Sequence, residues 1–150
     1  IGVNNEPGIA FHMFSLLAKK GVNVDIILQS VGRDSKKDIS FTTTLSSLET
    51  ALEVINENKE MFGASEVISD TSIAKVSIVG AGMINNTGVA AKMFEALYDA
   101  HINIQMISTS EIKISVLISR DDADQAISVL IDKDLADIAV NTIHSKFINK

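Results

Sequence analysis

Apolar positions in the first thirty residues follow a helical spacing and then a strand-like one. Four apolar residues fall at i, i+3, i+4 and i+7, which is one face of an amphipathic helix. Gly21 follows them, at a place where a left-handed residue commonly ends a helix. The run VNVDIILQSV, residues 22–31, is rich in β-branched residues and predicts a strand. The helical face consists of Ala10, Met13, Phe14 and Leu17.

The same order of residues returns about eighty positions later. When residues 2–30 are laid over residues 82–110, ten residues are identical, which indicates a duplicated module. We therefore predict two domains, residues 1–71 and 72–150, with the first strand of the first copy cut short at Ile1. The identical pairs are Gly2/Gly82, Asn5/Asn85, Gly8/Gly88, Ala10/Ala90, Met13/Met93, Phe14/Phe94, Leu17/Leu97, Asn23/Asn103, Ile27/Ile107 and Ser30/Ser110.

The second half of the first copy predicts two strands around a helix. DISFTTTL, residues 38–45, predicts a strand, and Ser46 with Glu49 has the capping-box spacing for the helix that follows. EVISD, residues 66–70, predicts a short closing strand. The polar loop 32–37 is longer than its counterpart in the second copy, and we interpret it as a solvated spacer.

The second copy repeats this order. A helix is predicted near residues 121–132, and His101 stands where the first copy has Gly21, so we expect a different helix end there. The predicted strands of this copy are AKVSIVG, NIQMIST, EIKISVLI and IAVNTI.

Each copy therefore reads β-α-β-β-α-β, a split β-α-β arrangement with two helices on one face of an antiparallel sheet. The predicted fold class is α+β, with two ferredoxin-like modules. Each module has about half of the 150 residues, which is short for an independent core. We therefore expect the two modules to pack as a pair.

Composition excludes several classes of function. The formal charge is −6 with scattered Lys and Arg, so no basic surface is available for nucleic acid or an anionic membrane. There is no Cys, which removes thiolate nucleophiles and thiolate metal sites and fits a cytoplasmic protein. No apolar run reaches the roughly twenty residues of a membrane span. The chain begins at Ile1, inside a predicted strand, and we interpret it as a fragment of a longer protein.

The turn Asn4-Asn5-Glu6-Pro7-Gly8 leads directly into the first helix. A helix start offers unpaired N–H groups and a positive dipole end, which suit a carboxylate or a phosphate. Gly8 lacks a Cβ, so a ligand could approach its backbone. The alternative is an ordinary N-terminal turn with Asn5 or Glu6 as the cap.

Asp25 is an acid in an otherwise apolar strand, where the second copy has Gln105. A buried carboxylate needs a partner, and a ligand ammonium would be one; the alternative is an edge residue that faces water. Gln29, Ser30 and the run 108–111 add hydroxyl and amide groups at the strand ends. Together, a helix start for a carboxylate and an acid for an ammonium describe a receptor for a free amino acid.

Other motifs give weaker indications of function. Gly80-Ala81-Gly82 suggests a dinucleotide fingerprint, but Asn85 occupies the third glycine position. His12, His101 and His144 lie far apart without a carboxylate at ligand spacing, so no metal site is expected. No set of nucleophile, base and orienting group is present, and we expect no catalytic residue and no cofactor in this chain.

Several strings resemble the tandem ACT domains at the carboxyl end of aspartate kinase. NNEPGIAFHMFSLLAKKGVNVDIILQS is similar to the first ACT domain, and KVSIVGAGM, TGVAAKMFEAL and NIQMISTSEIKISVLI are similar to the second. The resemblance implies feedback control by threonine, lysine or both, a homodimer formed through the ACT domains, and a catalytic kinase domain or subunit as partner. ATP and Mg²⁺ would belong to that absent kinase domain.

The resemblance also assigns roles to residues. The effector carboxylate would be held by the loop and helix start, the ammonium by Asp25, and a further contact would come from Gln29. Glu6 departs from the family, in which relatives often have a basic residue. The strand ends resemble those of threonine-sensitive relatives and of relatives sensitive to both amino acids, so the resemblance implies threonine, with lysine replacing it or acting with it. The alternative is a dimerisation module that binds no ligand. The other matched residues are Asn5, Gly8, Ile9 and Ala10 in the first module and Asn103, Ile104 and Ser110 in the second.

Overall fold

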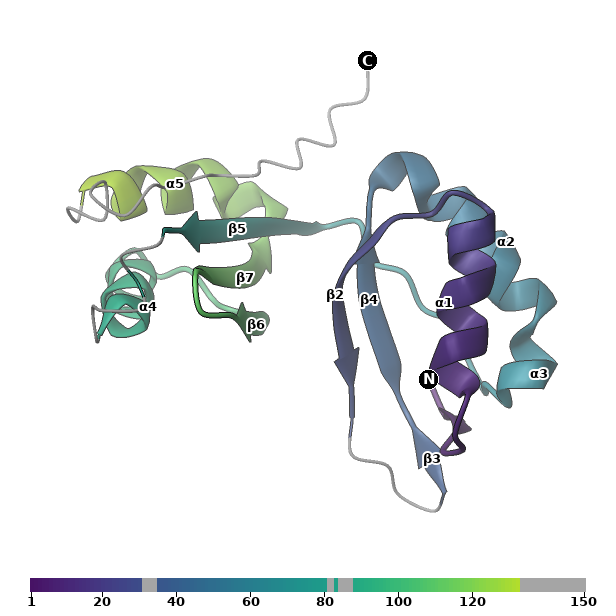
Figure 1. Cartoon of the computed structure of the whole chain (residues 1–150). Helices are drawn as coiled ribbons and strands as arrows, with labels where there is room; N and C mark the ends of the chain where they lie inside the picture. The colour runs from purple at the N-terminus through teal and green to yellow at the C-terminus, as the bar shows by residue number, and fades with distance from the viewer. Residues whose placement is uncertain (31–34, 81–82, 84–87, 133–150) are drawn as a thin grey trace. The chain divides into compact units, whose positions relative to one another are not determined.

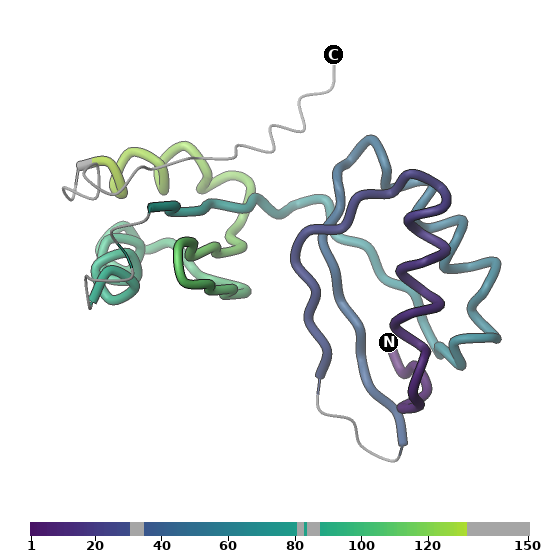
Figure 2. The backbone as a smooth tube through the Cα atoms, viewed as in Figure 1, coloured from purple at the N-terminus to yellow at the C-terminus, as the bar shows by residue number. Residues whose placement is uncertain are grey.

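The computed structural model describes residues 1–30, 35–80, 83 and 88–132. The chain divides into two compact units between Ser69 and Asp70 (Figures 1 and 2). We call residues 1–69 unit 1 and residues 70–132 unit 2, and each contains one copy of the repeat. The predicted closing strand of the second copy, residues 138–143, lies outside the described residues.

Unit 1 has two short antiparallel pairs of strands, and its helices lie on one side of the pair β2-β4 (Figure 1). Strand β1 pairs with β3, and β2 pairs with β4, with Ile27 opposite Phe41 and Gln29 opposite Ile39. The short helix α3 ends at Gly63, whose φ of 63° is left-handed. The elements are β1 Val3–Asn4, α1 Ile9–Lys19, β2 Val24–Gln29, β3 Lys36–Lys37, β4 Ile39–Thr43, a 3-10 turn at Leu45–Ser47, α2 Leu48–Glu57 and α3 Lys59–Phe62.

The predicted helical face forms part of the core of unit 1. Met13 and Leu17 are buried, and Ala10 and Phe14 are half-buried on the same side of α1. Phe14 meets Phe41 of β4 edge to face, with ring centroids 5.7 Å apart. Helix α2 completes this core. The buried residues are Val3, Ile9, Met13, Leu17, Val22, Ala51, Val54, Ile55 and Phe62.

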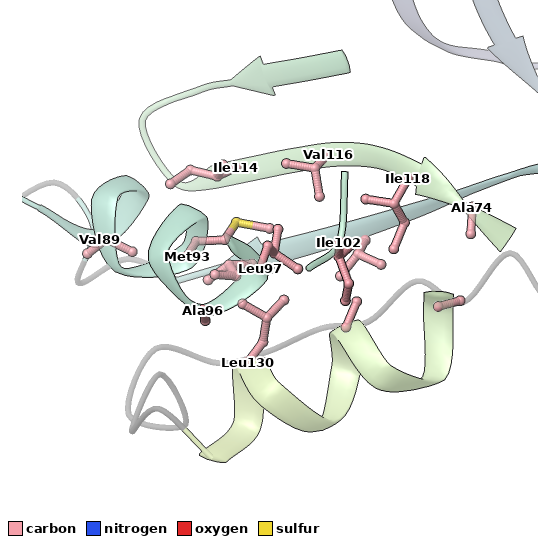
Figure 3. Packing of buried hydrophobic residues seen from close by; sticks show 14 residues of the cluster. Ala74, Val89, Met93, Ala96, Leu97, Ile102, Ile114, Val116, Ile118 and Leu130 are labelled. Atoms are coloured by element: carbon pink, nitrogen blue, oxygen red, sulfur yellow. The ribbon is translucent and has the colours of Figure 1, made fainter. Parts of the chain in front are cut away.

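Unit 2 has a three-stranded antiparallel sheet in the order β5-β7-β6. Its strands and its second helix agree with the predicted segments. Figure 3 shows Met93 and Leu97 of α4 and Leu130 of α5 packed beneath Ile114 and Val116 of β7. The elements are β5 Ile73–Val79, α4 Val89–Asp99, β6 Met106–Thr109, β7 Lys113–Ser119, a 3-10 turn at Arg120–Asp122 and α5 Ala123–Asp132.

The end of the second repeat helix corrects one prediction. His101 has a φ of 58°, close to the 74° of Gly21, so both copies end their first helix in the same left-handed way. The following amide bonds back in both copies, from Val22 to Leu17 at 3.0 Å and from Ile102 to Leu97 at 2.9 Å. The expected difference in the cap was therefore wrong, because the helix end is fixed by these backbone bonds.

Three further predictions for unit 1 were wrong. Residues 66–70 form no strand, because Ile68 is 64% exposed and lacks a buried face. Ser46 does not cap α2, since it lies inside the preceding 3-10 turn and bonds Thr44 through its hydroxyl. The loop that was interpreted as a spacer contains β3 at residues 36–37, which pairs with β1.

Within the described part of the chain, no helix is long and apolar enough to cross a membrane.

Candidate functional site

Helix α1 begins at Ile9 without a side-chain cap. Gly8 is the N-cap residue, with a left-handed φ of 96°, and no side chain in the described part of the chain bonds this helix start. The first helical bond runs from the His12 N–H to the Gly8 carbonyl at 2.9 Å. The N–H groups of Ile9, Ala10 and Phe11 therefore have no acceptor within the helix. Capping by Asn5 or Glu6, the ordinary alternative, is wrong for this structure.

The residues of this turn differ in exposure. Asn5 and Gly8 are exposed, Ala10 is half-buried, and the side chain of Ile9 packs into the core. Ile9 can therefore offer a ligand its backbone N–H but not its side chain. The Asn5 N–H donates to the carbonyl of Ser35 at 3.0 Å, which ties the turn to the strand after the loop.

The end of β2 lies at the same end of unit 1 as the turn. Two hydrogen bonds connect Ser30 and Asp38. The Ser30 N–H donates to the Asp38 carbonyl at 3.0 Å, and the Asp38 N–H donates to Ser30 Oγ at 2.9 Å. The Gly2 N–H donates to Asp38 Oδ1 at 2.8 Å. Asp38 thus links the first strand to the end of β2, and this brings exposed Gln29 to the region of the α1 start, as Figure 1 shows for β2 and β3.

Asp25 lies at the other end of β2. It is the second residue of that strand and is exposed, so the argument from a buried carboxylate does not apply in this structure. Asp25 and Gln29 are four residues apart, which is about 13 Å along an extended strand. Unit 1 therefore brings Asn5, Gly8 and Gln29 to one end of the module and places Asp25 apart from them.

The candidate residues of unit 2 flank β6 in the same way. Asn103 is exposed and Ile104 packs against the core, both before the strand begins. Ser110 follows the strand and is exposed, and its N–H donates to the carbonyl of Lys113 at 2.7 Å in a tight turn. Helix α4 begins after Gly88, which has the same φ of 96° as Gly8 and also lacks a side-chain cap.

Known proteins place this pair of modules in a family. The family model for the ACT domain matches residues 1–58 and 76–130. The chain belongs to the ACT domain family. It is 47% identical over 126 residues to the aspartokinase of Pseudomonas aeruginosa, covering 84% of this chain and 31% of that relative.

Solved ACT structures agree with this assignment. The regulatory subunit of aspartate kinase from Thermus thermophilus, in a ligand-free form, is 39% identical with a TM-score of 0.81, and the match covers 89% of this chain and 88% of that one. The structure of aspartokinase α and β subunits gives 40% identity and a TM-score of 0.79, covering 88% and 86%. The ACT pair thus corresponds to the regulatory region of aspartokinases and not to their catalytic kinase domain.

The sequence alone did not predict the residues that hold the turn at residues 4–8 in unit 1. Ser35, Lys36 and Asp38 lie in or beside the loop that was interpreted as a spacer, yet each bonds the first five residues of the chain. The one available signal was the greater length of this loop in the first copy. A difference in length does not indicate which residues pair with which.

Among the described residues of unit 2, Asp70 and Lys75 have shifted pKa values. Ser72 donates two hydrogen bonds to Asp70 Oδ1, from its hydroxyl at 2.6 Å and from its backbone N–H at 2.8 Å. These bonds lower the pKa of the Asp70 carboxyl. Burial, with a smaller contribution from the nearby Lys113 charge, lowers the pKa of Lys75 below its ordinary value. Neither group lies in the candidate site. No cluster of metal-ligating side chains occurs in the part of the chain that the structure describes.

Proposed function

We propose that this chain is the part of an aspartokinase that binds threonine as a feedback effector, with lysine replacing it or acting with it. The observation that carries the proposal is the uncapped start of α1 after a left-handed glycine. The open N–H groups of Ile9, Ala10 and Phe11 would receive the effector carboxylate, because anions are stabilised at helix starts.

The separation of Asp25 from this helix start limits how the pocket is assembled. In a free amino acid the ammonium and carboxylate groups are attached to the same carbon, so one molecule cannot reach across about 13 Å of strand. The ammonium partner at the helix start would therefore come from a second ACT module of the assembled enzyme. Asp25 would take the ammonium of an effector that is bound at the other end of β2.

Effector binding would control the kinase by a difference in affinity. An effector that binds one arrangement of the modules more tightly shifts the enzyme toward that arrangement. A coupling of about 1 to 3 kcal/mol corresponds to roughly 5- to 150-fold regulation. The kinase domain that responds would be the catalytic partner of this region.

A second candidate is a dimerisation module without a ligand. Apolar side chains are exposed on the two corresponding strands, Ile27 by 49% and Leu28 by 39% on β2 and Ile107 by 46% on β6. Exposed apolar strands favour association with another chain. We expect a homodimer in either case, and a monomer in sedimentation at high micromolar concentration would contradict it.

Calorimetric titration separates the two functions. The chain is titrated with threonine, with lysine, and with each in the presence of the other. Saturable heat of binding identifies the effector. Asp25→Ala should weaken the binding of that effector. Gln105→Ala, the same position in the second copy, serves as the matched control. The absence of heat and of any thermal shift would reject the receptor and leave the dimerisation module.

A further inference from the structure

The side chain of Lys36 connects two backbone segments beside the turn. Its Nζ donates to Asn4 Oδ1 at 2.7 Å and to the carbonyl of Gly63 at 2.8 Å. Asn4 is also the backbone partner of Lys36 in the pairing of β1 with β3. Gly63 is the residue that ends α3. One ammonium group therefore ties the first strand to the end of a helix about sixty residues later.

Gly63 leaves room for this arrangement. A Cβ built on Gly63 would overlap the side-chain amide of Asn4, and the φ of 63° also favours glycine. The Asn4 amide is thus enclosed by the Lys36 ammonium and the Gly63 backbone. Two contacts from different parts of unit 1 fix its position.

The fixed position of Asn4 bears directly on the turn. The next residue is Asn5, whose N–H donates to the carbonyl of Ser35, the neighbour of Lys36. Three residues further on, Gly8 is the N-cap residue of α1. The turn is therefore anchored at one end by Ser35 and Lys36 and at the other by α1.

We infer that Lys36 is a positioning residue for the effector site: by holding Asn4, it sets the turn that presents the N–H groups of α1 to the effector carboxylate. This inference rests on the proposed function. Lys36 acts through Asn4 and Gly63, so it needs no contact with the effector. In unit 2 a tight turn from Ser110 to Lys113 replaces the longer loop, and this device is therefore a feature of unit 1.

The test compares Lys36→Met with Lys20→Met in the 150-residue chain. Lys20 is exposed at the opposite end of α1 and provides the matched loss of a lysine charge. Each variant is titrated with threonine and with lysine, and circular dichroism with thermal unfolding establishes that it is folded. Without effector, NMR amide exchange is measured for the turn and helix start. Asn4→Ala removes only the acceptor and gives an independent second variant.

We expect the effector Kd to rise about 3- to 10-fold in Lys36→Met and in Asn4→Ala, the range for residues that act through a neighbour. The exchange of the Asn5 amide should be faster in both variants, and Lys20→Met should match the unmodified chain. An unchanged Kd in Lys36→Met would overturn the inference. If the unmodified chain binds neither amino acid, the proposed function fails, and amide exchange then decides the positioning role: faster exchange at Asn5 supports it, and unchanged exchange overturns it.

Discussion

The two ACT units begin their first helices alike but build different sheets beside them. Helices α1 and α4 each have eleven residues and follow a glycine with a φ of 96°. In unit 2, β5 pairs along its whole length with β7. In unit 1, the counterpart of β7 is divided into β3 and β4 at Asp38. The carboxylate of Asp38 accepts a hydrogen bond from the Gly2 N–H.

This difference shows where a duplicated module can change. The helix start and the apolar helix face are common to both copies, because they satisfy the backbone and form the core. The loop beside the helix start differs, and in unit 1 it supplies side chains that hold the turn. We therefore expect unit 1 to be the module whose helix start is adapted to a ligand.

Removal of a matched core side chain should have the largest effect. Leu17 and Leu97 are equivalent in the repeat and both are fully buried. Truncation of either to alanine should cost about 2 to 5 kcal/mol of unfolding free energy, because it leaves a cavity. Amide exchange should rise mainly in the unit that is changed. Tyr98→Ala is the control, since Tyr98 is 77% exposed; equal acceleration in both units would contradict separate cores.

A buried hydroxyl pair distinguishes the two sheets. Ser77 and Ser115 of unit 2 are fully buried with their Oγ atoms 2.8 Å apart, whereas Ser40, the counterpart of Ser115 in unit 1, is exposed. Ser115→Ala should cost about 1 to 3 kcal/mol in chemical denaturation, because it leaves Ser77 without its partner. Ser40→Ala should cost little.

The double variant Ser77→Ala/Ser115→Ala sharpens this comparison. Removing both hydroxyls leaves no unpaired group, so this variant should be more stable than Ser115→Ala alone. A double variant that loses the sum of the two single effects would show that the serines are independent.

The two first-repeat helices end in the same left-handed conformation with different residues, Gly21 in unit 1 and His101 in unit 2. An added Cβ at Gly21 would meet nothing within 4 Å, so Gly21→Ala tests the backbone conformation alone. We expect a loss of about 1 kcal/mol for Gly21→Ala and a gain of similar size for His101→Gly. Thermal unfolding measures both. A His101→Gly variant without added stability would mean that His101 makes a compensating contact.

The smallest effect should come from Lys75 in the sheet of unit 2. Its pKa is lower in the folded chain than its ordinary value of 10.5, so between the two values the unfolded chain binds more protons and stability rises with pH. The cost of burying the charged form is present at neutral pH and is relieved as the pH rises through the folded pKa.

Lys75→Met should therefore raise the unfolding free energy at pH 7 by less than about 1 kcal/mol, because water still reaches much of the side chain. The advantage over the unmodified chain should shrink in urea titrations as the pH approaches 10.5. An advantage that grows with pH would contradict the direction of the shift.

Periodic patterns predicted most of the fold. The faces of α1 and α4 and the strands β2, β4, β5, β6 and β7 lie where the apolar spacing placed them, because each pattern is local. The turn with Gly8 before α1 was also predicted, but the sequence left open whether Asn5 or Glu6 caps the helix. Such features depend on residues that are close in sequence.

The contacts around the turn could not be predicted in the same way. Lys36 reaches Asn4 across 32 residues and Gly63 across 27, and such side-chain bonds leave no periodic pattern. The exposure of Asp25 depends on which elements cover β2, which its own apolar neighbours do not indicate. His101 adopts a conformation that its residue type disfavours, because the surrounding backbone bonds require it.

The most direct test of the effector receptor is an NMR titration of the isotope-labelled chain with threonine, read at the two helix starts. We predict that the amide signals of Gly8, Ile9 and Ala10 shift and saturate, while those of Gly88, Val89 and Ala90 change much less. Shifts confined to the second set, or no saturable shift at either helix start, would contradict the assignment of the effector carboxylate to α1.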